Sequence, residues 1–363
     1  MKTPFKITGL VAAAHTPFRA DGTLHLAAVE KQAAHFLQHQ IRVVFIAGST
    51  GESHSLAVEE RRQLAQRWLE VARGTQLQVM VHVGSNCLTD AVALASHAQR
   101  IGAVAISALA PSYFKPRSVA ALLDWCAAIA GAAPSLPFYF YDIPVLTGVS
   151  LAMPEFLAQG RAQISNLAGI KWTNADLYSY QLCQRVTGDF DLPWGNDEYL
   201  LAALALGATG AVGSTYCFAA PVYHRLLQAF AAGDLATARV EQFRSCQLVQ
   251  LLASYGYMGA AKATMKLLGV DVGPARQPNS NLNDLQVKDL RTKLEGLGFF
   301  DWINLESATE NYAAVAGFRL GIFCGRPQPS TDSRTTKSRV AQRATRLRAL
   351  SNCRASRGGF RPR

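Results

Sequence analysis

One lysine at the end of an apolar run is the residue of this chain with the most evident chemistry. The segment 167–173 reads LAGIKWT, which predicts a buried strand ending at Lys171. Burial disfavours the charged ammonium and lowers its pKa, so the neutral amine can attack a carbonyl carbon and form a Schiff base. The alternative is a lysine that extends from the strand end to water. Taken alone, the segment favours this second interpretation.

Hydroxyl and phenol groups follow other apolar segments in the same way. The sequence Gly48–Ser49–Thr50–Gly51–Glu52 follows a predicted strand, and its backbone N–H groups and hydroxyls suit a carboxylate or phosphate, or alternatively a helix cap. Along the segment 138–144 (FYFYDIP), alternation places Tyr139 and Tyr141 on one face. At the strand end, Tyr141 is positioned either to relay a proton near Lys171 or only to satisfy a buried hydrogen bond.

Three further loops carry polar groups or exposed aromatic rings. Gly195–Asn196–Asp197–Glu198 places two acids at a predicted helix start, where the helix dipole alone would favour them and where they could also bind sugar hydroxyls. Gly213–Ser214–Thr215–Tyr216 is a second glycine and hydroxyl loop. Tyr113 and Phe114 stand in a proline-flanked loop, a pattern that favours packing over chemistry.

Apolar strands alternate with amphipathic helices along the first two thirds of the chain. Eight strand and helix units of this kind predict a (β/α)8 TIM barrel, with a doubly wound open sheet as the alternative. The predicted strands are Gly9–Ala14, Val43–Ala47, Val79–Val83, Ala103–Ser107, Pro137–Tyr141, Leu167–Lys171, Leu192–Gly195 and Thr209–Gly213. Because chemistry in such barrels lies at the carboxyl ends of the strands, all the loops described above are expected to meet there.

The chain divides into three parts. Residues 1–232 form the predicted barrel, and residues 233–304 form a C-terminal helical appendix packed on it. The helices expected in this appendix are Ala236–Ser254, Met258–Leu268 and Asn283–Leu297. Residues 305–363 form a tail rich in Ser, Thr and Arg, which we expect to be solvated and disordered.

The net charge of +11 resides mostly in this tail. Residues 305–363 contain 12 Lys or Arg and three acids, a charge of +9, which leaves 24 bases and 22 acids, or +2, for residues 1–304. The body therefore has no electrostatic reason to bind nucleic acid. A nucleic-acid-binding arm is the alternative interpretation of the tail alone.

Composition also bears on location and on metal binding. No apolar run approaches the roughly 18 residues of a membrane span, and the N-terminus lacks the layout of a signal peptide. We therefore expect a cytoplasmic protein without membrane contact. The seven cysteines are scattered and form no C-x-x-C pair, which argues against disulfides and zinc. No metal site is expected, because no His, Cys and Asp cluster has ligand spacing.

Four motifs together resemble one family. Segments 48–52 (GSTGE), 141–148 (YDIPVLTG), 169–171 (GIK) and 213–216 (GSTY) are similar to those of the pyruvate-dependent class I aldolases. This family includes the N-acetylneuraminate lyases and the dihydrodipicolinate synthases. The resemblance covers roughly residues 7–304 and implies a barrel, a homotetramer, and a Schiff base between lysine and pyruvate without a metal or cofactor.

The resemblance is closer to the animal-type lyases of the family. The synthases carry an arginine, which binds a second carboxylate, at the position of Leu146, and leucine cannot do so. The implied reaction is the reversible retro-aldol cleavage of N-acetylneuraminate, a sialic acid, to N-acetylmannosamine and pyruvate. The alternatives are another aldolase or dehydratase of the family that acts on a different 2-keto sugar acid, and a non-catalytic barrel that binds sugar acids. Trp172 and Asn196 depart from the family pattern and leave the sugar preference open; Trp172 would narrow the pocket if it pointed inward.

The same resemblance implies a role for each candidate residue. Lys171 matches the Schiff-base lysine, and Tyr141 matches the tyrosine that transfers the proton. Tyr113 matches a tyrosine that enters the hydroxyl relay or a neighbouring subunit's site. The residues that match substrate contacts are Ser49, Thr50, Thr173, Gly195, Asp197, Glu198, Gly213 and Ser214.

Overall fold

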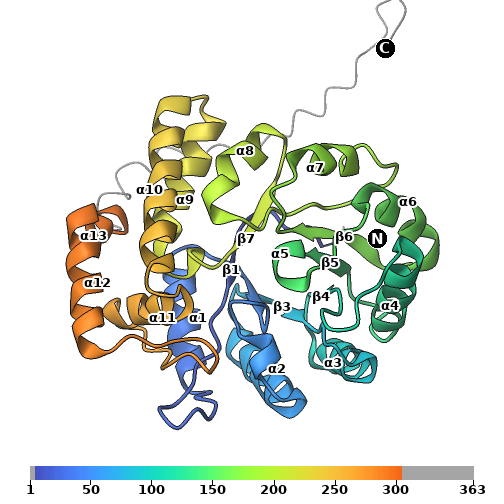
Figure 1. The fold of residues 1–363 in the computed structure, drawn as a ribbon, viewed down its shortest axis with the longest axis horizontal. Coiled ribbons are helices and arrows are strands. Elements are labelled where there is room, and N and C mark those ends of the chain that lie inside the picture. The colour runs from blue at the N-terminus through green and yellow to red at the C-terminus, as the bar shows by residue number, and fades with distance from the viewer. Residues whose placement is uncertain (1–4, 305–363) are drawn as a thin grey trace, which may run out of the picture. The chain divides into compact units, whose positions relative to one another are not determined.

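The computed structural model describes residues 5–304, in which parallel strands form a barrel surrounded by helices (Figure 1). Within these residues, seven strands pair in the order β6-β5-β4-β3-β2-β1-β7, and every pair is parallel. The strands are β1 (Gly9–Ala13), β2 (Val43–Ile46), β3 (Gln78–His82), β4 (Ala105–Leu109), β5 (Phe138–Asp142), β6 (Leu167–Trp172) and β7 (Gly210–Gly213). Seven of the eight predicted strands are thus present at nearly their predicted positions.

The remaining predicted strand, Leu192–Gly195, is the seventh in chain order and is not a regular strand. Residues 191–194 instead lie between β6 and β7 and pair with both through isolated bridges. The N–H of Trp172 donates to Pro193 O at 2.8 Å, and the N–H of Trp194 donates to Gly210 O at 2.9 Å. Pro193 lacks an N–H and cannot extend the ladder, which accounts for the irregularity. The fold is a TIM barrel closed by this segment.

Helices cover the outside of the barrel (Figure 1). Those that follow strands are α1 (Ala28–Gln38), α2 (Val58–Ala72), α3 (Leu88–Ile101), α4 (Val119–Gly131), α6 (Met153–Gln163), α7 (Leu177–Cys183), α8 (Leu200–Ala205) and α9 (Tyr216–Ala231). Three short helices lie in loops: η1 (Ser53–Ser55), α5 (Pro144–Thr147) and η2 (Asp197–Tyr199). The helix α5 has only a single turn, and α9 contains Pro221 and has a kink at Ala219.

Side chains alternate between the inside of the barrel and the layer beneath the helices. The inner cluster contains Val11, Phe45, Met80, Tyr139 and Tyr141. The larger outer cluster contains the side chains of the same strands that point toward the helices. Ile170 and Trp172, which flank Lys171 in the sequence, belong to it. This period of two places Tyr141 and Lys171 on the inner face of neighbouring strands.

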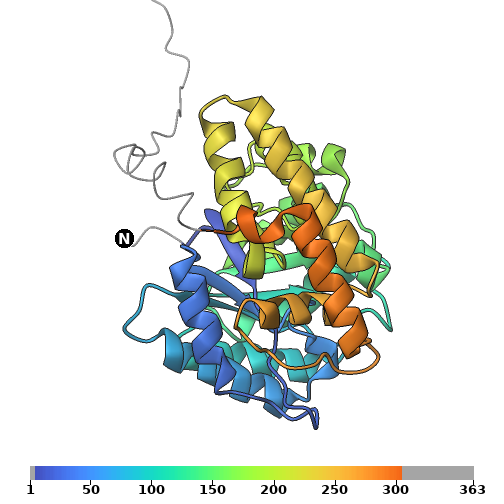
Figure 2. The same ribbon diagram turned by 90° about the vertical axis from the view of Figure 1, so that its left-hand side faces the viewer.

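Four helices follow the barrel. They are α10 (Leu235–Ala253), α11 (Met258–Leu267), α12 (Asp284–Leu297) and α13 (Phe299–Trp302). Helix α10 packs along α9, and α12 contacts α10 and α11, as Figure 2 shows. Asn283 and Gln286 form a capping box at the start of α12, which stabilises the predicted helix start.

The expectations about membrane contact and about residues 305–363 have different outcomes: the structure bears on the first and does not describe the second. Among the described residues, no helix is both long and apolar enough to cross a membrane. The predictions for residues 305–363, a disordered tail or a nucleic-acid-binding arm, lie outside the residues that the structure describes.

Candidate active site

Lys171 is buried at the carboxyl end of β6. Only 3% of the residue is exposed, and its Nζ donates a hydrogen bond to Thr173 Oγ1 at 2.8 Å. The same nitrogen lies 3.7 Å from the centroid of the Tyr141 ring. Burial lowers the pKa of the Lys171 amine, while Tyr141 and Asp197 oppose this shift. A lowered pKa increases the fraction of neutral, nucleophilic amine at neutral pH.

Tyr141 lies directly beside Lys171, because the two residues are register partners of β5 and β6. Its hydroxyl is 3.3 Å from Ser49 Oγ in the loop after β2. The structure therefore brings together the lysine, the phenol and the first hydroxyl of the segment 48–52. Thr50 follows Ser49 in the same turn, and both are half-buried.

A buried histidine supports the Tyr141 ring. The His82 ring meets the Tyr141 ring edge-on, with centroids 5.9 Å apart, and its Nδ1 donates to Ala47 O at 2.9 Å. Burial and the neighbouring Arg61 lower the pKa of His82, which keeps the ring neutral. Sequence reasoning assigned this residue no role, although its place at the end of β3 is the same signal that singled out the other strand ends.

Two glycines allow the loops on the far side of Lys171 to approach closely. A Cβ at Gly195 would lie 1.9 Å from Thr173 Oγ1, and a Cβ at Gly213 would lie 1.9 Å from Asp197 Oδ1. Neither contact is sterically allowed, so a side chain at either position would displace a candidate site residue. Glycine is therefore required at both positions for a steric reason.

Asp197 is buried and held by hydroxyl groups. Its Oδ2 accepts hydrogen bonds from Thr215 N at 2.8 Å and Thr215 Oγ1 at 2.5 Å. Burial raises the pKa of Asp197 to about 6, and the Thr215 hydrogen bonds and Lys171 oppose the shift. Glu198 follows in η2 and is half-buried. The arrangement presents a carboxylate with one oxygen, Oδ1, beside Gly213.

Tyr257 contacts a candidate site residue, and sequence reasoning missed it. Its hydroxyl lies 2.5 Å from Ser214 Oγ, and its backbone has a positive φ of 35° immediately before α11. A non-glycine residue in this region is strained and is retained where its surroundings hold it. No local pattern places residue 257 at a strand end, because the contact joins the helical appendix to the barrel.

The structure also places Tyr113 and Trp172, two residues whose roles the sequence left open. Tyr113 is 77% exposed and lies against Phe114, with ring centroids 4.9 Å apart, so the structure does not bring it to Lys171. Trp172 is fully buried in the outer layer, where its Nε1 donates to Asn174 O and its ring packs against Tyr180. Trp172 therefore does not narrow the pocket around Lys171.

Among residues 5–304, no group of three or more His, Cys, Asp or Glu side chains lies close enough together to hold a metal ion.

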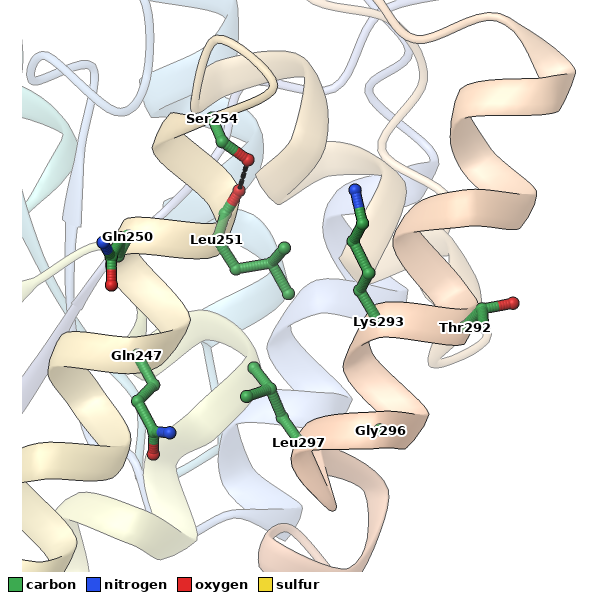
Figure 3. Close-up of a pocket in the computed structure, with 8 residues that line it drawn as sticks. All are labelled: Gln247, Gln250, Leu251, Ser254, Thr292, Lys293, Gly296 and Leu297. Atoms are coloured by element: carbon green, nitrogen blue, oxygen red, sulfur yellow. Dashed lines mark hydrogen bonds between the residues drawn. The ribbon is translucent and has the colours of Figure 1, made fainter.

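A groove of about 590 Å³ lies away from the site, between α10 and α12 (Figure 3). Its walls include Gln247, Leu251, Lys293 and Leu297. None of the candidate residues lines this groove.

The protein is a TIM barrel with a buried lysine at the carboxyl end of its sixth strand, the edge at which barrel enzymes carry their chemistry. The chain matches the dihydrodipicolinate synthetase family over residues 6–296, and it belongs to that family.

The relatives and solved structures that resemble the chain include several lyases. The chain is 40% identical to N-acetylneuraminate lyase A of Xenopus laevis over 279 residues, which is 75% of this chain and 90% of that protein. It is 37% identical to N-acetylneuraminate lyase of Gallus gallus over 297 residues, 80% of this chain and 96% of that protein. The structure of Proteus mirabilis N-acetylneuraminate lyase matches with a TM-score of 0.79 at 37% identity, over 81% of this chain and 100% of that one. The resemblance inferred from four motifs is confirmed.

Proposed function

We propose that this protein is an N-acetylneuraminate lyase, a Schiff-base aldolase that reversibly cleaves N-acetylneuraminate to N-acetylmannosamine and pyruvate. The observation that carries the proposal is the buried amine of Lys171, which lies 3.7 Å from the Tyr141 ring in a chain 40% identical to such a lyase. Burial lowers the pKa of this amine, as a nucleophile for a ketone requires.

The covalent step uses Lys171. Its neutral amine adds to the C2 ketone of the open-chain substrate, and loss of water gives a protonated imine. This cation accepts the electron pair of the C3–C4 bond as the bond breaks, while the C4 hydroxyl loses its proton and becomes the aldehyde of N-acetylmannosamine. The remaining enamine takes a proton at C3, and hydrolysis of the imine releases pyruvate and restores Lys171.

Tyr141 is proposed to take the C4 proton. Its hydroxyl lies 3.3 Å from Ser49 Oγ, so the proton has a second hydroxyl to which it can pass. The cation–π contact of Lys171 with the Tyr141 ring also favours the cationic imine over the neutral ketone. Tyr141 would therefore both take the C4 proton and stabilise the positive charge of the imine.

Ser49 and Thr50 are proposed to receive the substrate carboxylate. They are half-buried in the tight turn after β2, and their hydroxyls and backbone N–H groups suit an anion. A carboxylate held there would place the adjacent C2 carbon against Lys171, which supplies orientation to the reaction.

The opposite end of the site is proposed to bind the hydroxyl groups of the sugar. Asp197, Glu198, Ser214 and Thr173 supply side-chain oxygens, and Gly195 and Gly213 supply backbone groups. The raised pKa of Asp197, about 6, still leaves it ionised at pH 7 as an acceptor for hydroxyl donors. The reaction so described proceeds without a metal or other cofactor.

The proposal includes a cytoplasmic homotetramer. Tyr113 and Phe114 after β4, and Val145 and Leu146 in α5 after β5, are large apolar side chains exposed on loops that follow neighbouring strands. Exposed apolar patches of this kind are typical of interfaces, and they suit a second copy whose site Tyr113 would enter. Sedimentation of the wild-type protein and of Tyr113→Ala tests this part of the proposal. We expect a tetramer for the wild-type protein, and a monomer in both samples would contradict it.

The decisive experiment is reduction with borohydride in the presence of pyruvate, followed by peptide mapping. We expect a reduced pyruvyl adduct on Lys171 and none on Lys262, which is also buried and serves as an internal control. A cleavage assay with N-acetylneuraminate and a panel of other 2-keto sugar acids then identifies the substrate. A folded protein that forms no adduct would overturn the proposal and leave a barrel that binds sugar acids without cleaving them.

A further inference from the structure

The loop that is proposed to bind the substrate carboxylate ends in a buried ion pair. Glu52 closes the segment 48–52 with a left-handed φ of 54°, and its Oε1 lies 2.6 Å from Nζ of Lys262 in α11. The two side chains are 0% and 1% exposed, respectively. Burial of two charges is costly unless the pair is close and its remaining hydrogen bonds are made.

Those remaining bonds are present on both sides of the pair. Lys262 Nζ donates to Thr16 O at 2.8 Å and to Pro274 O at 2.9 Å, and it lies 4.4 Å from the centroid of the Phe18 ring. The second oxygen of Glu52, Oε2, accepts from Arg276 N at 2.8 Å and from Asn279 Nδ2 at 3.2 Å. The ion pair therefore ties the loop to the segment after β1 and to the helical appendix.

The backbone of the loop transmits this attachment to the hydroxyl groups. Glu52 N donates to Ser49 O at 3.0 Å, and Ser53 N donates to Gly48 O at 3.2 Å, so the position of Glu52 defines the turn that carries Ser49 and Thr50. Ala47 and Glu52, which flank the turn, both have positive φ angles of 53° and 54°. Residues in this strained conformation are retained only where neighbouring contacts hold them.

We propose that Glu52 and Lys262 are positioning residues that hold the carboxylate-binding turn in its productive geometry, so that α11 contributes to substrate binding without contacting substrate. The inference rests on the proposed function of Ser49 and Thr50. It also separates the two buried lysines: Lys171 lies against a hydroxyl and a phenol ring and is available for chemistry, whereas Lys262 is paired with a carboxylate.

The test compares Glu52→Gln, Lys262→Met and the double variant. Each single change leaves one buried charge without its partner and lowers the melting temperature, whereas the double change removes both charges and restores much of it. If the pair positions the turn, the double variant still has a KM raised about 10-fold to 100-fold, with kcat changed much less. The borohydride adduct at saturating pyruvate still forms on Lys171.

Two further variants keep the test informative if a buried substitution prevents folding. Asn279→Ala removes one hydrogen bond to Glu52 from a half-buried position, and we expect a smaller rise in KM with a normal melting temperature. Lys266→Met lies one helical turn beyond Lys262 and breaks an exposed pair with Asp271, whose side chains are 69% and 55% exposed. This matched control leaves KM unchanged.

The possible results separate the two proposals. If the wild-type protein forms no pyruvyl adduct, the proposed function fails. If the wild-type protein forms the adduct but the folded double variant has the wild-type KM, the positioning role of Glu52 and Lys262 is overturned while the function stands. A KM raised equally in the Lys266→Met control would also overturn it.

Discussion

The two ends of the candidate site are held in different ways. At the proposed pyruvate end, the turn that carries Ser49 is attached by an ion pair in which both charges are buried. At the proposed sugar end, Asp197 is held by uncharged groups: Thr215 donates to it, and a chain of hydroxyls continues through Tyr223 to Ser245. The first end therefore depends on two opposite charges, whereas the second contains one carboxylate that gains a proton at a pH near 6.

Substitution of Lys171 has the largest expected effect. Lys171→Met keeps a long apolar side chain in the buried position but removes the amine, so the imine cannot form. We expect kcat/KM for N-acetylneuraminate to fall by more than about 10³-fold and the pyruvyl adduct to disappear. Circular dichroism of the variant controls for folding. A variant that keeps appreciable activity would show that the chemistry does not depend on this lysine.

Substitution of Tyr141 has the next largest effect and separates proton transfer from imine formation. Tyr141→Phe keeps the ring that lies against Lys171 and removes only the hydroxyl. We expect kcat to fall by about 10²-fold to 10⁴-fold, as for loss of a general acid or base, while pyruvate still forms an adduct. Both quantities can be measured on one preparation. If adduct formation is lost as well, the hydroxyl acts earlier in the reaction than proposed.

Removal of the charge on Asp197 tests the sugar end alone. Asp197→Asn keeps the shape of the side chain but loses a charged acceptor, which contributes about 1.5–3 kcal/mol per hydrogen bond. We expect KM for N-acetylneuraminate to rise by about 10-fold to 100-fold, whereas the affinity for pyruvate, measured by adduct formation, stays the same. An equal loss of pyruvate affinity would show that the two ends are not independent.

The raised pKa of Asp197 predicts that substrate binding depends on pH. Burial raises the pKa of Asp197 from 3.8 to about 6, so the carboxylate is increasingly protonated as the pH falls below 6. We expect KM for N-acetylneuraminate to rise over this range, and the rise to be absent in Asp197→Asn. Because the folded state binds this proton more tightly than the unfolded chain, Asp197 makes the fold less stable as the pH rises from about 4 to about 6. Thermal melting of the wild type and Asp197→Asn across that window checks the sign.

Candidate residues at both ends of the site could be predicted from the sequence. Lys171, Tyr141, Ser49 and Asp197 were found because parallel strands bring their carboxyl ends to one edge, and alternation places every second residue inward. These are local regularities. The irregular pairing at Pro193 was not predicted, although a proline within a predicted strand is a sequence signal against regular pairing.

The supports of the site could not be predicted in this way. Lys262 is 210 positions from Glu52 in the sequence, and Tyr257 is 43 positions from Ser214. No periodicity relates such pairs, since they depend on how the helical appendix packs on the barrel. The direction of Trp172 follows from alternation once Lys171 is known to point inward, and the structure places it in the outer layer accordingly.

The smallest expected effect concerns the hydroxyl chain behind Asp197. Tyr223 OH lies 2.6 Å from Thr215 Oγ1 and 2.7 Å from Ser245 Oγ, and all three residues are buried. Tyr223→Phe leaves the Thr215 hydrogen bonds to Asp197 in place but removes the group that orients the Thr215 hydroxyl. We expect a loss of about 1 kcal/mol of stability and a rise of less than about 5-fold in KM for N-acetylneuraminate, with no change toward pyruvate.

Tyr180→Phe is the matched control for this variant, because the Tyr180 hydroxyl is also buried but donates to Leu192 O outside the chain to Asp197. It should lose similar stability without a change in KM. If both variants raise KM equally, the effect is one of general packing. If Tyr223→Phe alone raises KM, the sugar end depends on a hydroxyl group that acts on the substrate through Thr215 and Asp197. The pyruvate end depends in the same indirect way on its buried ion pair.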